Sequence, residues 1–292
     1  MTATEHRPTP GSPSDDAARR AYWTEQLELG DAFVQRLLAY PVVDCGERLA
    51  ALPEAAAAAG VEMAFSDSPI VDDLPRVHRV REGLVEDILA IGRDMNRRGW
   101  ILKVEDGFRS LEMQRRLVRK PGLFDAIVDR CVWELGGAPP APDFVFRRAI
   151  VMVANIPKIG THMSASAIDI SVLRRDDGQE VWRGDGYPHI SERTPMRSPF
   201  VEPEALANRQ AITAIMEAHG FRHYPFEFWH YSQGDAIARL VAGDPRPARY
   251  GPIDWDPRTG AIEPVADAFT PLNPLDVIER EIATAVRRRE SA

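Results

Sequence analysis

The chain has 292 residues, of which 44% are apolar and 27% are charged, and this composition is typical of a soluble globular protein. Its 36 basic and 44 acidic residues give a formal net charge of −8, which argues against a nucleic-acid partner. The N-terminus lacks the apolar core of a signal peptide, and no later run reaches the length of a membrane span. We therefore expect a cytoplasmic protein without a membrane partner. The two cysteines, Cys45 and Cys131, are too few for a disulfide framework and are interpreted as buried small hydrophobic residues.

The N-terminal part of the chain begins with a polar segment. Residues 1–16 are rich in Pro, Ser, Thr and Asp and are expected to be a disordered tail, because they cannot bury enough apolar surface to become ordered. The apolar positions from 17 to 40 predict a helix that ends before Pro41. An alanine-rich helix is expected at 54–59, and the turn signals and acidic residues of 66–75 indicate a surface loop.

The next elements lead to an arginine at a strand end. Apolar residues at helical spacing predict a helix from 84 to 95 that stops at Gly99. A strand is expected at 100–108, followed by Arg109 and by Ser110, which can cap the next helix. Taken alone, Arg109 would be interpreted as a solvated surface residue.

Two later segments contain residue types that bind zinc. His162 lies in a loop of small residues, and Asp169 lies in a segment, AIDISV, that alternates like a half-buried strand. The aromatic segment FEFWHY, which favours a strand or a strand end, places Glu227 three residues before His230. Two histidines and one aspartate would leave a fourth zinc position open to water, which is typical of catalytic zinc. Glu227, as a nearby carboxylate outside the ligand set, could move protons.

The remaining segments have less specific patterns. The long loop at 172–200 could line a substrate cleft with Trp182, Tyr187 and His189, or could be surface decoration. A helix is expected at 202–219, and another follows Asn273 and Pro274. The apolar stripe of that last helix is expected to dock on the same domain, with a dimer contact as the alternative; its members are Leu275, Ile278, Ile282 and Val286.

Three motifs, in this order, resemble those of the zinc D-alanyl-D-alanine dipeptidases of the VanX type, within the D-Ala-D-Ala metallopeptidase group. DGFR at 106–109 is similar to the family's Asp-Gly-Tyr/Phe-Arg, HMSASAID at 162–169 to its His-x6-Asp, and EFWH at 227–230 to its Glu-x-Trp-His. The resemblance covers roughly residues 30–240. It implies that one zinc ion per chain is bound by His162, Asp169 and His230. It also implies that Glu227 is the general base and acid and that Arg109 stabilises the transition state.

The resemblance also implies an architecture. The expected fold class is α+β, a hedgehog-like zinc peptidase fold whose central antiparallel sheet carries the ligands and is flanked by helices. The zinc metallopeptidase domain is expected at 17–244, and 245–292 would be a C-terminal extension with a terminal helix. The chain departs from the family pattern at Gly160, where the family has serine, and at Ala165, where it has glycine. These departures predict weak cleavage of D-Ala-D-Ala relative to another small amide.

Three functional hypotheses follow from these residues. The first is zinc-dependent hydrolysis of a small dipeptide, D-Ala-D-Ala or a related D-amino-acid dipeptide. The second is a zinc amidase that acts on another small amide in a biosynthetic pathway. The third is a non-catalytic zinc-binding or peptide-binding module, and the presence of Glu227 and Arg109 argues against it. The sequence leaves the oligomeric state open.

Overall fold

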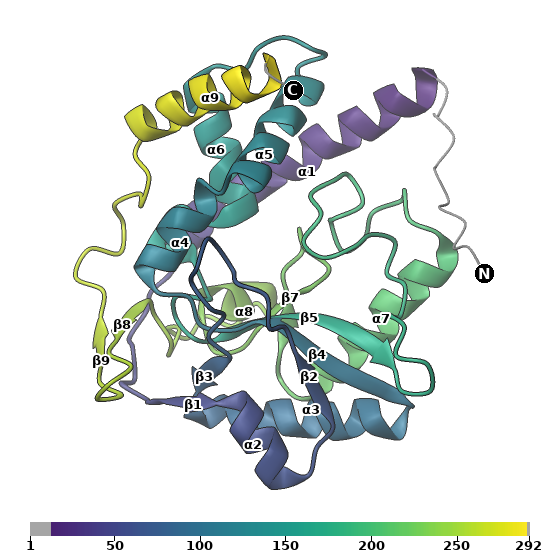
Figure 1. Ribbon diagram of the computed structural model, residues 1–292, viewed down its shortest axis with the longest axis vertical. Coiled ribbons are helices and arrows are strands. Elements are labelled where there is room, and N and C mark those ends of the chain that lie inside the picture. The colour runs from purple at the N-terminus through teal and green to yellow at the C-terminus, as the bar shows by residue number, and fades with distance from the viewer. Residues whose placement is uncertain (1–12, 291–292) are drawn as a thin grey trace.

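The computed structural model describes residues 13–290, and its centre is a five-stranded sheet (Figure 1). Its strands, in spatial order, are β2 (Met63–Phe65), β4 (Trp100–Asp106), β5 (Ala167–Arg174), β7 (His230–Ser232) and β6 (Arg222–His223). The neighbours from β4 to β6 are antiparallel, whereas β2 pairs with β4 in parallel. The expected α+β class is therefore correct, and the expected antiparallel sheet is wrong at this one edge.

Strand β5 is buried on both of its faces. Ile168 and Ile170 are fully buried in an apolar cluster with residues of the helices beneath the sheet, and Asp169 on the opposite face is only 3% exposed. The expectation of a half-buried strand is thus wrong. The alternation in AIDISV separates an apolar face from a polar face that is also covered, because further helices lie over it.

One layer of helices covers the lower face of the sheet in Figure 1. It contains α2 (Leu52–Ala59) and α3 (Val85–Arg97), and α7 (Pro203–Ala218) packs against α3. The predicted helical spacing of α3 is confirmed, since Ile88, Ile91 and Met95 are fully buried. Gly99 then adopts a φ of +78°, which lets the chain turn from α3 into β4.

A second layer of helices lies over the opposite side of the sheet (Figure 1). Its members share one apolar cluster and are α1 (Pro13–Ala39), α4 (Leu111–Val118), α5 (Pro121–Glu134), α6 (Pro142–Val153), α8 (Ala236–Val241) and α9 (Leu275–Glu290). The predicted cap of α4 is confirmed, because the Ser110 hydroxyl accepts a hydrogen bond from the Met113 N–H at 3.2 Å. Pro121 and Pro142 start α5 and α6, where a missing N–H group costs no helical hydrogen bond.

Helix α1 begins earlier than the sequence indicated. Residues 13–16, assigned to the tail, belong to the helix, while residues 1–12 lie outside the described part of the chain. Asp15 and Asp16 lie in the first turn, where they complement the helix dipole, and each forms an ion pair with an arginine one turn later, Arg19 and Arg20. These local contacts stabilise the first turn without a contribution from buried apolar surface.

The region after residue 244 shares the core of the preceding residues. Strand β8 (Ile253–Trp255) pairs with β9 (Ile262–Pro264), and Ile253 packs with Phe108 and Ala165. Helix α9 packs on α5 and α6 through Ile278, which is fully buried.

The other connections include short strands and turns. Strand β1 (Leu49–Ala51) pairs with β3 (Arg79–Arg81), and 3-10 turns are formed at Glu82–Leu84 and Pro157–Ile159. The loop at 66–75 is less superficial than expected, because Ile70 and Val71 are buried. Cys131 is buried as expected, whereas Cys45 is exposed, because it lies in a segment without regular structure. Over the described residues, no helix combines the length and apolar character that crossing a membrane requires.

Candidate metal centre

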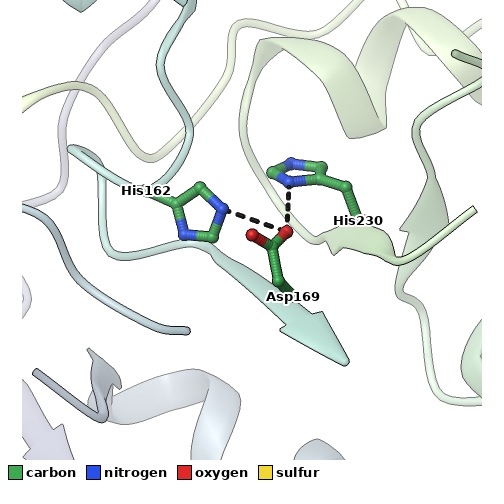
Figure 2. A group of neighbouring side chains, drawn as sticks. All are labelled: His162, Asp169 and His230. Carbon is green, nitrogen blue, oxygen red and sulfur yellow. Dashed lines mark hydrogen bonds and ion pairs between the residues drawn. The ribbon is translucent and has the colours of Figure 1, made fainter. Parts of the chain in front are cut away.

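The three predicted ligands meet at one point. Asp169 of β5 lies opposite His230 of β7 in the sheet register, and His162 approaches from the loop before β5. The Nε2 atom of His162 is 3.2 Å from Asp169 Oδ1, and the Nδ1 atom of His230 is 3.0 Å from the same oxygen. Figure 2 shows both imidazole rings directed at this carboxylate. All three side chains are buried.

The donor atoms of this group fit a divalent metal ion. One ligand atom from each residue lies within 4.8 Å of the others. Ligand atoms bound to zinc at about 2.0–2.1 Å are roughly 3.3 Å apart in a tetrahedron, and the observed separations of 3.0 and 3.2 Å from Asp169 are close to this value. The Nε2 atom of His162 is buried without a hydrogen bond. A bound cation would accept the lone pair of this nitrogen, which otherwise carries the free-energy cost of a buried polar atom without a partner.

Each imidazole is oriented through its second nitrogen. His162 Nδ1 lies 2.7 Å from the carbonyl oxygen of Gly107, and the tautomer that donates to this oxygen leaves a lone pair on Nε2. His230 Nε2 lies 2.8 Å from the Thr161 hydroxyl, which directs Nδ1 toward Asp169. Gly107 must come close to a neighbouring strand, because an added Cβ atom would lie 2.8 Å from the carbonyl oxygen of Val77.

The loop that carries His162 is held by a buried arginine. The Nε atom of Arg81 donates to the Ser164 carbonyl at 2.8 Å, and its backbone N–H donates to the Ala165 carbonyl at 2.9 Å. The next residue, Ser166, donates its hydroxyl to Asp235 at 2.8 Å. Ala165 itself adopts a φ of +54°, a conformation that L-residues disfavour and that the family's glycine would adopt without cost.

The second oxygen of Asp169 is held by two further side chains. Arg109 Nη2 donates to Oδ2 at 3.1 Å, and the Tyr187 hydroxyl donates to it at 3.2 Å. Arg109 also donates to Asp106 at 2.6 Å and to Gln114 at 3.3 Å. Burial alone would raise the pKa of the Asp169 carboxyl, but the neighbouring histidines outweigh burial and hold this pKa well below its usual range. Asp169 is therefore an ionised acceptor with one oxygen directed at the histidines.

Glu227 lies in the turn before β7 and faces the same space. Burial of its carboxyl group among protein atoms, with a smaller contribution from the Asp169 charge, raises the pKa of Glu227 to about 8. A carboxyl group with this pKa can both accept and release a proton near neutral pH.

A cavity of about 570 Å³ joins these residues. Arg109, Glu227 and the three candidate ligands line it, as do Tyr187 and His189 of the loop at 172–200. The third aromatic residue expected there, Trp182, is 47% exposed and lies elsewhere.

The sequence reasoning missed several polar residues of the site. Arg76 lines the cavity, and its Nη1 atom lies 3.5 Å from Asp106 without making a hydrogen bond. No local signal distinguished Arg76 or Gln114 from ordinary loop and helix residues. Asp106 was visible in the DGFR motif, but its contact with Arg109 depends on the turn after β4.

Comparison with known proteins reveals one recurrent similarity. Residues 137–245 match a family described as D-ala-D-ala dipeptidase, and this segment contains His162, Asp169, Glu227 and His230 but not Arg109. The D-alanyl-D-alanine dipeptidase of Synechocystis is 27% identical over 235 residues, which cover 71% of this chain and 90% of that protein.

Two further relatives align over shorter segments. The D-alanyl-D-alanine dipeptidase of Enterococcus faecalis is 28% identical over 29% of this chain and 42% of its own length. The Escherichia coli protein of the same description is 30% identical over 32% of this chain and 47% of its own length. The chain thus matches less than half the length of these two relatives.

Proposed function

We propose that this chain, which is similar to D-alanyl-D-alanine dipeptidases, is a zinc-dependent peptidase that hydrolyses a small dipeptide, D-Ala-D-Ala or a related D-amino-acid dipeptide. The observation that carries this proposal is the convergence of His162, Asp169 and His230 in one cavity with Glu227 and Arg109. The hedgehog-like arrangement and one zinc ion per chain belong to the same proposal and rest on the family resemblance. A cytoplasmic location is also proposed, and it rests on the sequence alone.

The residues that line the cavity have separate roles in the proposed hydrolysis of the amide. A zinc ion held by the three ligands would supply Lewis acidity that favours attack by water on the amide carbonyl. Glu227 accepts the proton of the attacking water and passes it to the leaving amine nitrogen. Tyr187 holds Asp169 Oδ2 and so leaves Oδ1 directed at the two imidazoles.

Arg109 stabilises the negative charge that develops on the carbonyl oxygen. Its hydrogen bonds to Asp106, Gln114 and Asp169 fix the guanidinium, which still has N–H groups available for an oxyanion. A preorganised donor of this kind contributes roughly 3–4 kcal/mol to the transition state. A non-catalytic binding module would not require this donor beside Glu227.

A second candidate function retains the same residues. A zinc amidase that acts on another small amide is supported by the two departures from the family motif, Gly160 and Ala165, of which Gly160 lines the cavity. Both functions predict the same ligands and the same proton carrier, and they differ in the substrate alone.

The test is hydrolysis by zinc-loaded protein of a panel of D,D, L,D and L,L dipeptides and related amides. We expect His230→Ala to lose stoichiometric zinc, and Glu227→Gln to retain zinc while losing about 10²–10⁴-fold in rate. His219→Ala is the matched control, since His219 pairs with Asp94 outside the cavity, and it should retain both zinc and activity. Full zinc content in His230→Ala, or near-normal turnover by Glu227→Gln, would overturn the proposal.

A further inference from the structure

The cavity is larger than a dialanine substrate needs. Its volume of about 570 Å³ lies within the roughly 300–1,000 Å³ typical of sites for drug-sized ligands. Protein interiors are otherwise close-packed, with few voids larger than a water molecule. A peptide that carries two methyl side chains would leave much of this space to water. The excess space can accommodate a larger group than a methyl side chain.

The excess wall of the cavity is apolar and is formed by helices of the second layer. Its most deeply buried side chains are at most 9% exposed overall, and they are Val34 and Leu37 of α1, Leu117 of α4, Ile150 and Val151 of α6 and Ile237 of α8. All belong to the apolar cluster that unites these helices, so backbone packing holds them in place. Water against such a wall makes few hydrogen bonds, and its displacement by an apolar group favours binding.

The arginines of the cavity belong to the region around the metal ligands. Arg109 and Arg76 are both paired with Asp106, and Arg109 also reaches Asp169. Glu227 interacts electrostatically with the same pair, Asp169 and Arg109. The amide and the charged ends of a small substrate are therefore bound near the reacting groups. The part of the substrate that can contact the apolar wall formed by α1, α4, α6 and α8 is then one of its side chains.

We infer that the preferred substrate is a dipeptide with a bulky apolar side chain, of leucine or phenylalanine size, on one of the two residues that flank the scissile amide. This inference rests on the proposed peptidase function and names its substrate class.

The first measurement compares kcat/KM for D-Ala-D-Ala with that for peptides in which either residue is leucine or phenylalanine, in D and L forms. One buried methylene group typically changes kcat/KM by about 10-fold or more. We therefore expect at least one leucine or phenylalanine peptide to exceed D-Ala-D-Ala by about tenfold or more. D-Ala-D-Ala as the best substrate of the panel would overturn the inference.

A matched pair of variants on one helix tests the location of the subsite. Leu37 and Leu27 both lie on α1 and are 1% and 4% exposed, but only Leu37 is among the residues that line the large cavity. Leu37→Phe should lower kcat/KM for the bulky peptides about tenfold and change that for D-Ala-D-Ala much less. Leu27→Phe should leave the ratio of kcat/KM for the bulky peptides to kcat/KM for D-Ala-D-Ala unchanged. Val34→Leu, a smaller addition on the same wall, provides the same comparison if Leu37→Phe does not fold.

Binding separates failure of the inference from failure of the proposed function. Calorimetric titration of zinc-loaded Glu227→Gln protein with D-Ala-D-Ala and with the bulky peptides measures affinity without turnover. If the bulky peptides bind more tightly than D-Ala-D-Ala and Leu37→Phe abolishes this difference, the result supports the subsite. If the parent protein nevertheless hydrolyses none of the peptides, the peptidase proposal alone is overturned. Equal affinities, or equal effects of the two phenylalanine variants on the affinity ratio, would overturn the subsite.

Discussion

Gly160 and Met163 lie so close together that a Cβ atom added at Gly160 would be 2.1 Å from Cε of Met163. The φ of Gly160 is −87°, which any residue can adopt, so steric contact rather than backbone conformation disfavours a side chain there. Met163 is fully buried, and its movement would disturb the core beneath the His162 loop. A serine at position 160 therefore requires the buried side chain of Met163 to move.

The first prediction concerns this contact. Gly160→Ser should lower the free energy of unfolding by about 1–3 kcal/mol, as overpacked core positions do. Adding Met163→Leu, which removes the terminal methyl that clashes, should recover part of the loss. Urea denaturation of the two single variants and the double variant gives the coupling energy. Equal losses with and without Met163→Leu would show that this contact is not the cause.

The second prediction compares two alanines in the left-handed region. Ala154 and Ala165 have φ values of +52° and +54°, a conformation that costs an L-residue about 1 kcal/mol or more. Ala154→Gly, at the C-cap of α6, should therefore raise the melting temperature. Ala165→Gly should change it little, because the relief is offset by loss of a methyl that packs with Phe108 and Ile253 and contributes about 0.8 kcal/mol. A large stabilisation by Ala165→Gly would contradict this account.

The third prediction concerns the carbonyl that orients His162. Gly107→Ala should push the backbone away from Val77 and misplace the oxygen that accepts from His162 Nδ1. Loss of such a contact lowers metal affinity by about 10–100-fold. Competition with a zinc-binding dye measures the effect. Gly122→Ala is the control, since an added Cβ atom there meets no heavy atom within 4 Å, and its zinc affinity should equal that of the parent.

The fourth prediction follows from the pKa of Glu227. In the metal-free folded protein this pKa is raised from 4.5 to about 8, so the folded state binds more protons than the unfolded chain between these values. Its contribution to stability is therefore fully present below about pH 4.5 and is lost as the pH rises through 8. The slope is at most ~1.4 kcal/mol per pH unit, and water in the cavity reduces it.

Glu227→Gln removes this titration. Metal-free Glu227→Gln should match the parent in free energy of unfolding near pH 4.5 and exceed it at pH 8. Urea denaturation of both proteins in the presence of a chelator checks this. A stability difference that does not vary with pH would show that the carboxyl is not destabilised by burial.

The local patterns of the chain predicted several of the helices and strands and the residue types of the candidate donor set. The helical spacing before Gly99 and the cap at Ser110 are properties of neighbouring residues, and the structure contains both. His162, Asp169 and His230 were identified by residue type and order, and the structure brings them together. The assignment of Glu227 and Arg109 to catalysis remains a prediction, although both line the cavity.

Tertiary structure alone decided which residues surround these donors. The parallel pairing of β2 with β4, the burial of Ile70 and the contact of Tyr187 with Asp169 join segments far apart in the chain. The cavity likewise depends on helices α1, α4, α5, α6 and α8, whose apolar stripes look alike in sequence whether they face a packed core or an open space. The helical periodicity of apolar residues predicts that a side chain is removed from water, because burial is a property of one helix face. Whether that side chain meets protein or a cavity depends on the distance between elements, and that distance is set by the packing of the whole domain.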